Sequence, residues 1–179
     1  MTTEPAWQKY IPSFCTASPN LTQERIAIVQ KTWQTLKSGK GKGVRGGLGL
    51  NPNEQDAIDL ISDLFFSNLF KIAPDLRLLY KGSMTKQGRA LSSMLNALVD
   101  LLSKDTMALG ATLTRLAERH NKYGIKPEHY DPFGQAFVIM LRAGLGEDFT
   151  PETCAAWVHV YSTICSVMIP ITLKMADCG

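Results

Sequence analysis

The amino-acid sequence predicts an all-α fold, and three observations support that prediction. Six segments of the 179-residue chain repeat apolar residues at a spacing of three or four, as one face of a helix requires. No segment alternates apolar and polar residues in the way that a half-buried strand does, and the sequence has no internal repeat. A chain of this length buries about 70 % of the surface that it exposes when unfolded, which is enough for one core.

The first helix is expected over residues 21–37. Its apolar face is formed by Ile26, Val29, Trp33 and Leu36. The side chain of Thr22 can accept a hydrogen bond from a free amide of the first turn, so we expect it to be the N-cap. The segment 38–53 follows, in which Gly and basic residues prevail. Because nothing in it is expected to pack, it predicts a mobile loop.

The basic side chains in and before this loop allow two interpretations. They are Lys37, Lys40, Lys42 and Arg45. A solvated loop is the simpler interpretation, and binding of an anionic lipid or polymer is the alternative. The run GKGKGV is not a phosphate-binding P-loop, because it lacks the required spacing and has no Ser or Thr after the Lys.

Three helices are expected in the middle of the chain, over residues 54–72, 84–103 and 106–121. Pro74 ends the first of them, because the residue before a proline avoids the α region. The apolar stripe of the second comprises Leu91, Met94, Leu95, Leu98, Leu101 and Leu102. A Gly and a Pro that follow shortly after the third helix end it.

Two further helices are expected over residues 129–144 and 151–169. Thr150 is placed to cap the second of these, and Pro151 stands in its first turn, where proline is favoured. This last helix is apolar on nearly every side, so we expect it to be buried or to contact a second chain. Whether the chain forms a homodimer therefore stays open.

The elements divide the chain into an N-terminal extension (1–20), one helical domain (21–170, with its loop 38–53) and a C-terminal tail (171–179). We expect a helical stripe of the extension to dock on the chain's own surface; it consists of Trp7, Tyr10, Ile11 and Phe14. The N-terminus lacks the apolar stretch of a secretory signal, and no run of 18 apolar residues predicts a membrane span. We therefore expect a cytoplasmic protein. The net charge of +3 gives no reason to expect a nucleic-acid partner.

The chain has three histidines, and only His120 stands in a pattern that points to chemistry. No second His or Cys lies at metal-binding spacing, so a zinc site is not expected, and no hydrolase motif is present. His120 lies on the apolar face of its helix, four residues after Leu116 and seven after Leu113. A lone histidine on such a face is most often a core residue. The other interpretation is an iron ligand, because haem iron takes a neutral imidazole in an apolar slot as its proximal ligand.

Five pieces of the sequence resemble the globin family, in the order in which globins have them. They are LTQERIAIVQKTW (the first helix with its Trp), LFFSNLFKIAPDLRLLY (the second helix, the Pro turn and the aromatic residue that packs on haem), KQGRAL (the start of the distal helix), LAERHNKYGIKPEHY (the segment of the proximal His) and AAWVHVY (the last helix). The similarity runs from about Leu21 to Met168, interrupted by the loop. Within the family it is similar to the single-domain bacterial globins related to flavohaemoglobin haem domains, and to neuroglobin. It implies a globin domain over residues 21–170, a three-on-three helical sandwich around haem b.

The resemblance also implies the roles of single residues by their positions. His120 would be the proximal ligand of the iron, and Gln87 would take the distal place as a hydrogen-bond donor. Leu91, one turn further on, would overhang the iron. The other residues implied to form the haem pocket are Phe66, Tyr80, Leu116, Ile125, Tyr130, Phe133 and Phe137. Whether Met84 or Lys86 binds the iron as a sixth ligand stays open.

The sequence departs from the flavohaemoglobin pattern at several positions. Phe66 stands where relatives often have Tyr, which removes a distal hydroxyl donor. Tyr80 replaces the usual Phe and adds a hydroxyl that needs a partner or solvent. Thr172 stands where flavohaemoglobins have Glu, so we expect a less basic proximal imidazole. We also expect no flavin or NAD domain after Gly179.

The implied function is reversible binding of O₂, CO and NO at ferrous haem iron. O₂ held at this iron carries partial negative charge, so a hydrogen bond from Gln87 would stabilise it by about 1–3 kcal/mol, and CO would gain less. Two alternatives stay open. One is NO dioxygenase activity that depends on an external reductase, and the other is a gas or redox sensor.

Overall fold

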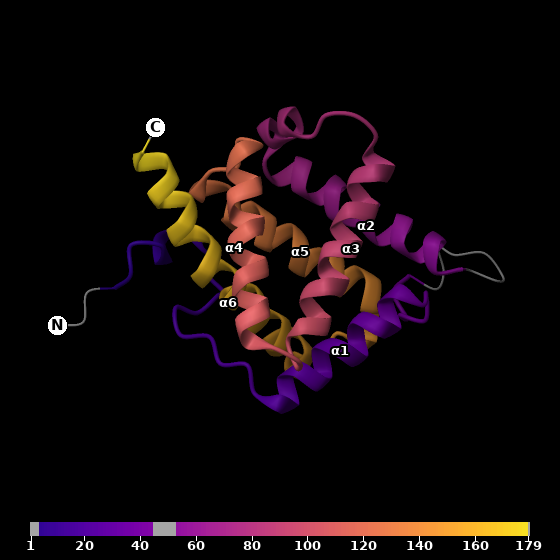
Figure 1. Cartoon of the computed structure of the whole chain (residues 1–179). Helices are drawn as coiled ribbons and strands as arrows, with labels where there is room; N and C mark the ends of the chain where they lie inside the picture. The colour runs from indigo at the N-terminus through magenta and orange to yellow at the C-terminus, as the bar shows by residue number, and fades with distance from the viewer. Residues whose placement is uncertain (1–3, 45–52, 179) are drawn as a thin grey trace.

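The computed structural model describes residues 4–44 and 53–178, and this part of the chain forms helices and no strand (Figure 1). The α-helices are α1 (Gln23–Lys37), α2 (Glu54–Ile72), α3 (Met84–Leu101), α4 (Thr106–Lys122), α5 (Tyr130–Leu145) and α6 (Pro151–Asp177). Short 3-10 helices lie between them, namely η3 (Pro74–Leu79), η4 (Pro127–His129) and η5 (Gly146–Asp148), and η1 (Gln8–Tyr10) precedes α1. The predicted all-α fold is confirmed.

The six α-helices form two layers of three. In one layer α3 packs between α1 and α4, and in the other α5 packs between α2 and α6. The layers meet where α6 crosses α1 and α4, and where α2 crosses α3. Figure 1 shows α5 behind the space between α4 and α3. This arrangement is the predicted three-on-three sandwich.

Capping residues fix where several helices begin. Thr22 Oγ1 accepts a hydrogen bond from Arg25 N at 3.2 Å, as predicted for the start of α1. Thr150 caps α6 in the same way. At the start of α2, Asn53 forms a reciprocal capping box with Asp56, which the sequence prediction did not include. Each cap pairs amides that a helix leaves free in its first turn.

The expectation that nothing in the loop packs is wrong for residues 38–44, the part before the gap in the described residues. Val44 is only 2 % exposed, and its N–H donates to the carbonyl of Gly144 at 3.2 Å. A Cβ atom on Gly41 would lie 2.5 Å from the same carbonyl oxygen, so only glycine allows this approach. The end of α1 is therefore tied to the end of α5 by a close backbone contact.

Two of the basic side chains in this region form ion pairs. Lys37 Nζ lies 3.6 Å from Glu54 Oε1, and Lys42 Nζ lies 3.5 Å from Glu147 Oε2. Arg45 and the other residues of the segment 45–52 lie outside the described residues. The first ion pair links α1 to α2, and the second reinforces the contact with the end of α5.

Helix α6 is longer than predicted. It continues to Asp177 instead of ending at 169, so residues 171–177, expected as a tail, are helical. Pro170 lies inside the helix, where it removes an amide donor. Ile169 and Thr172 beside it are almost fully buried, so tertiary packing holds the helix together past the proline.

By length and composition, α6 is also the one helix in the described ranges that could cross a membrane. This is weak evidence, because buried core helices of soluble proteins meet the same criteria. Trp157, Cys165 and Ile169 of this helix are buried, and α6 packs against α1 and α4. Part of its apolar surface is thus used in the core.

The N-terminal extension docks largely as expected. Trp7, Tyr10 and Ile11 pack against the core, whereas Phe14 is 41 % exposed and does not belong to the docked face. Only the three residues of η1 are helical, because Pro residues flank the segment on both sides. Backbone amides of the extension also bond to side chains of α6, as when Thr16 N donates to Ser162 Oγ at 3.1 Å.

Candidate functional site

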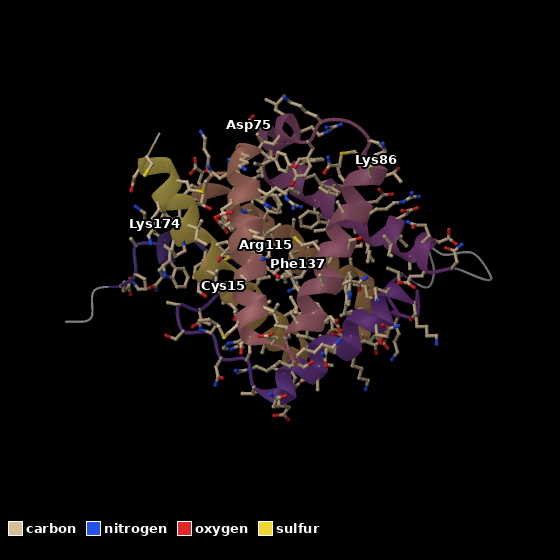
Figure 2. All side chains as sticks on the ribbon, viewed as in Figure 1. Cys15, Asp75, Lys86, Arg115, Phe137 and Lys174 are labelled. Atoms are coloured by element: carbon tan, nitrogen blue, oxygen red, sulfur yellow. The ribbon has the colours of Figure 1, made fainter. Side chains whose placement is uncertain are left out.

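A cavity of about 670 Å³ lies between α3, α4 and α5, with further walls from α2 and α6. All ten pocket residues named from the sequence line this cavity: Phe66, Tyr80, Gln87, Leu91, Leu116, His120, Ile125, Tyr130, Phe133 and Phe137. In Figure 2, Phe137 is labelled in the interior between the ribbons of α4 and α3. Residues from five separate helices and two connecting segments are therefore brought together at one place.

His120 occupies the last turn of α4 and is held by a hydrogen bond within that helix. Its Nδ1 lies 2.9 Å from the carbonyl oxygen of Leu116. Because a carbonyl can only accept, Nδ1 carries the hydrogen and Nε2 keeps a free lone pair. Burial holds the pKa of His120 below its ordinary value of 6.5, so the ring is neutral at neutral pH. A neutral imidazole with a free ring nitrogen is a metal ligand.

An aromatic cluster forms the wall that α2 and η3 contribute. The ring of Tyr80 lies 5.1 Å from that of Phe66, 5.6 Å from Phe70 and 6.5 Å from Phe133. Burial raises the pKa of the Tyr80 hydroxyl well above its ordinary value, so it remains a neutral phenol. These rings keep water away from this side of the cavity.

Gln87 lies in the first turn of α3 and lines the cavity. Its Nε2 donates to the backbone carbonyl of Lys81 at 3.3 Å. The amide is thus held by the turn before α3, and its second N–H can donate to a ligand in the cavity. Leu91, one turn along the same helix, is a half-buried apolar neighbour.

Two buried hydroxyl groups brace the start of α5 against α6. The hydroxyls of Tyr130 and Thr172 lie 3.1 Å apart, and Thr172 donates to the carbonyl of Met168 at 3.0 Å. Because Thr172 has one hydroxyl hydrogen and uses it there, Tyr130 is the donor to Thr172. Tyr161 in turn donates to the backbone carbonyl of Tyr130 at 2.5 Å. Burial raises the pKa of Tyr130 to about 12.

The other two histidines, and the two side chains left open as a sixth iron ligand, lie elsewhere. His129 Nδ1 accepts from Lys126 N, and His159 Nδ1 accepts from Asn20 N, so both rings are used in surface contacts. Neither Met84 nor Lys86 lines the cavity. In the part of the chain that the structure describes, no three His, Cys, Asp or Glu residues gather as a metal site.

Sequence reasoning missed part of the lining. The missed apolar residues include Met94, Leu95 and Leu98 of α3, and Tyr161, Ile164 and Met168 of α6. Both groups repeat at helical spacing, so the signal was present, but spacing alone does not tell which part of a stripe faces a cavity. Three cations at the mouth were also missed, namely Lys81, Arg119 and Lys122.

Comparison with protein-family models identifies the fold family. The model described as Globin matches residues 63–168, which is well over half of the chain. The chain belongs to the globin family. The match takes in α3, α4 and α5 together with most of α2 and α6, and so every residue identified above as lining the cavity.

Curated relatives of this globin include flavohemoproteins. It is 26 % identical to a flavohemoprotein of Halalkalibacterium halodurans over 121 residues, which is 66 % of this chain and 29 % of the relative. It is 25 % identical to a flavohemoprotein of Vibrio cholerae over 83 % of this chain and 34 % of the relative. Flavohemoprotein A of Dictyostelium discoideum is 24 % identical over 84 % of this chain and 33 % of its own length. The chain thus spans about a third of these relatives.

The sequence is also similar to that of a protein domain of known structure. It is described as the closed form of the globin domain of HGbRL, and it is 32 % identical to this chain. The similarity covers 86 % of this chain and 98 % of that globin domain, with a TM-score of 0.37.

Proposed function

We propose that this protein holds haem in the cavity with His120 as the iron ligand, and that it binds O₂, CO and NO reversibly there. Membership of the globin family and similarity to flavohemoproteins support haem-based gas binding in general. The assignment of residues and the choice of gases go further and rest on the geometry of the cavity.

The observation that carries the proposal is the state of His120. It is the one histidine that lines the cavity, its Nδ1 is bonded to the Leu116 carbonyl, and burial keeps the ring neutral. This combination leaves Nε2 as a ligand for iron and fixes the orientation of the ring. His129 and His159 do not line the cavity, and Nδ1 of each accepts a hydrogen bond from a backbone amide outside it.

The rest of the cavity suits haem as well. Leu91, Phe133 and Phe137 offer apolar surface for the two faces of the macrocycle, and the cations at the mouth offer partners for its two carboxylates. Haem b fits better than covalently attached haem, because the sequence has no two cysteines at the spacing that thioether attachment needs.

The side chains of the cavity have separate roles in this proposal. Ferrous haem supplies the site at which diatomic gases bind. Phe66 and Tyr80 exclude water, which protects the ferrous state from oxidation. Gln87 supplies an amide donor for a ligand with partial negative charge through the N–H that the Lys81 carbonyl does not use.

Reconstitution with haem tests the proposal. We expect haem to bind one-to-one, the reduced protein to give the spectrum of a CO complex, and O₂ to bind and leave when oxygen is added and removed. Absence of haem binding would refute it, and so would oxidation of the ferrous protein by O₂ without a stable oxygenated form. Repeated conversion of NO to nitrate in the presence of a reductase would favour the NO dioxygenase alternative instead.

A further inference from the structure

We propose that the mouth of the cavity is a docking surface for an acidic flavoprotein that reduces the bound haem. This proposal rests on the proposed function, because it concerns the delivery of electrons to the same site. It assigns a role to a concentration of positive charge that gas binding does not use.

The charge of the chain is strongly uneven. The segments 71–89 and 115–126 contain nine of the 19 Lys and Arg residues and only two of the 16 Asp and Glu residues. The rest of the chain therefore has more acidic than basic residues, although the net charge of the whole is only +3. We call the basic residues of these two segments the mouth patch.

The two segments meet at the mouth of the cavity. A Cβ atom on Gly124, just after α4, would lie 3.4 Å from Leu79 Cδ2 of η3, so these parts are in contact. Figure 1 shows the end of α4 beside η3 at the upper edge of the molecule. Lys81 and Lys122 line the cavity itself. Figure 2 labels Lys86 on the same side of the molecule.

The positive charge of the mouth patch faces solvent and is not offset by ion pairs. All nine basic residues are exposed. The ion pairs found among residues 4–44 and 53–178 use Lys37, Lys42 and Lys104, and none uses a cation of the mouth patch. Haem brings two carboxylates, which are too few to cancel an excess of seven positive charges. A positive field thus remains around the site where electrons must enter.

Exposed apolar side chains lie within the patch. Leu78 is 78 % exposed and Tyr123 is 65 % exposed, and they are next in sequence to Leu79 and Gly124, which contact each other. An interface with an apolar centre and a polar rim is typical of protein docking sites, whereas a bare charged loop lacks the apolar centre. Small complexes of this kind are typical of electron transfer, where the partners must separate after each encounter.

The step needs a reductant, and the partner's flavin supplies it. One electron passes from the reduced flavin to ferric iron, so the flavin is oxidised by one electron and the iron becomes ferrous. No covalent bond forms or breaks between the proteins. Opposite charges speed such an encounter about 10- to 1,000-fold, and salt suppresses the gain. This predicts an acidic face on the partner.

The test measures reduction of the ferric haem protein by hydroquinone flavodoxin, an acidic flavoprotein, under CO. The rate constant is followed by stopped flow as the ferrous CO complex forms, at low and at high salt. The variant K71E/K86E/R89E reverses three charges of the mouth patch that do not line the cavity. The control K9E/K31E/K174E reverses three exposed charges outside the patch, so both variants have the same net charge.

We expect the patch variant to react about tenfold or more slowly than the control at low salt, with the difference lost at high salt. The change Leu78→Ser should slow the reaction further without altering the charge. Equal rates for the patch variant and the control would overturn the proposal.

Two further measurements separate the possible failures. If dithionite still yields the CO complex in every variant, a negative result concerns docking and leaves gas binding intact. Sedimentation with phosphatidylserine vesicles tests whether the mouth patch binds a lipid surface instead of a flavoprotein. Binding of vesicles that is lost in the patch variant, with unchanged flavodoxin kinetics, would overturn the proposal in favour of a lipid surface.

Discussion

The position of His120 at the end of α4 determines the orientation of its imidazole and lowers its pKa. The Leu116 carbonyl, one turn earlier, orients the ring, and burial lowers its pKa. The apolar spacing of the sequence placed this residue on the inner face of its helix, and the globin resemblance suggested its role. The hydrogen bond of Gln87 to the Lys81 carbonyl was not predictable, because it depends on the path of the turn before α3.

Replacing the amide of Gln87 tests whether it serves bound O₂. The change Gln87→Leu should speed O₂ release about five- to 150-fold, because a hydrogen bond to a partly charged ligand contributes about 1–3 kcal/mol. The rate of CO release should change little, since CO carries less charge, and it provides the internal control. Flash photolysis and stopped flow give both rates. Unchanged O₂ release would mean that this amide does not stabilise bound O₂.

The hydroxyl of Thr172 is the only acceptor that the structure gives the buried Tyr130 hydroxyl within the described ranges. The change Thr172→Val should lower the free energy of unfolding by about 1–3 kcal/mol, because it leaves that donor unpaired. The control is Thr163→Val in the same helix, where the hydroxyl only donates to a carbonyl one turn earlier. Urea unfolding measures both changes. Equal losses would show that the bond between the two hydroxyls does not stabilise the fold.

At the scale of helices, the sequence predicted most boundaries and missed those set by tertiary contacts. The start of α1 at Thr22 and the span of α2 follow from local capping and periodicity. The continuation of α6 past Pro170 does not, because it depends on burial against other helices. The same holds for Val44, whose burial requires a close approach between glycines far apart in the sequence.

The crossing of α2 and α3 depends on Gly88. A Cβ atom there would lie 2.7 Å from Ser62 Cβ, and Ser62 Oγ has no hydrogen-bond partner in the described ranges. The change Gly88→Ala should therefore lower the free energy of unfolding by about 1–3 kcal/mol through overpacking. Adding Ser62→Gly should recover part of the loss, since it removes the atoms that clash.

A glycine in open space provides the control for this prediction. Gly110 lies inside α4 with nothing within 4 Å of an added Cβ atom. The change Gly110→Ala should stabilise the protein by up to about 1 kcal/mol through helix propensity alone. Thermal or urea unfolding of these three variants and of the natural sequence gives the comparison. Gly88→Ala with the same effect as Gly110→Ala would refute the close crossing.

At the scale of the whole molecule, two helical layers enclose an apolar cavity whose mouth is positively charged. The layers and the ten lining residues named from the sequence followed from periodicity and the globin resemblance. The placement of positive charge at the mouth did not, because the two basic segments 71–89 and 115–126 lie apart in the sequence and meet only in the fold. The three cations at the mouth become visible only when α4 and η3 are brought together by folding.

The haem-free protein should lose stability as the pH falls below the ordinary histidine value. Burial lowers the pKa of His120, His129 and His159 below 6.5 in the folded chain. Protons therefore bind more readily to the unfolded chain, so stability is complete above about pH 7 and declines as the pH falls through 6.5. Urea unfolding at about pH 7.5 and 5.5 should show a lower midpoint at the lower pH. An equal or higher midpoint at the lower pH would contradict the expected direction of these shifts.

Resonance Raman spectroscopy of the ferrous haem protein measures the bond between iron and the axial imidazole directly. We expect an iron–imidazole stretching band in the natural sequence and in the control variant His129→Gly. The band should be absent in His120→Gly and return when free imidazole is added to fill the space. An unchanged band in His120→Gly would contradict the account, because another side chain would then hold the iron.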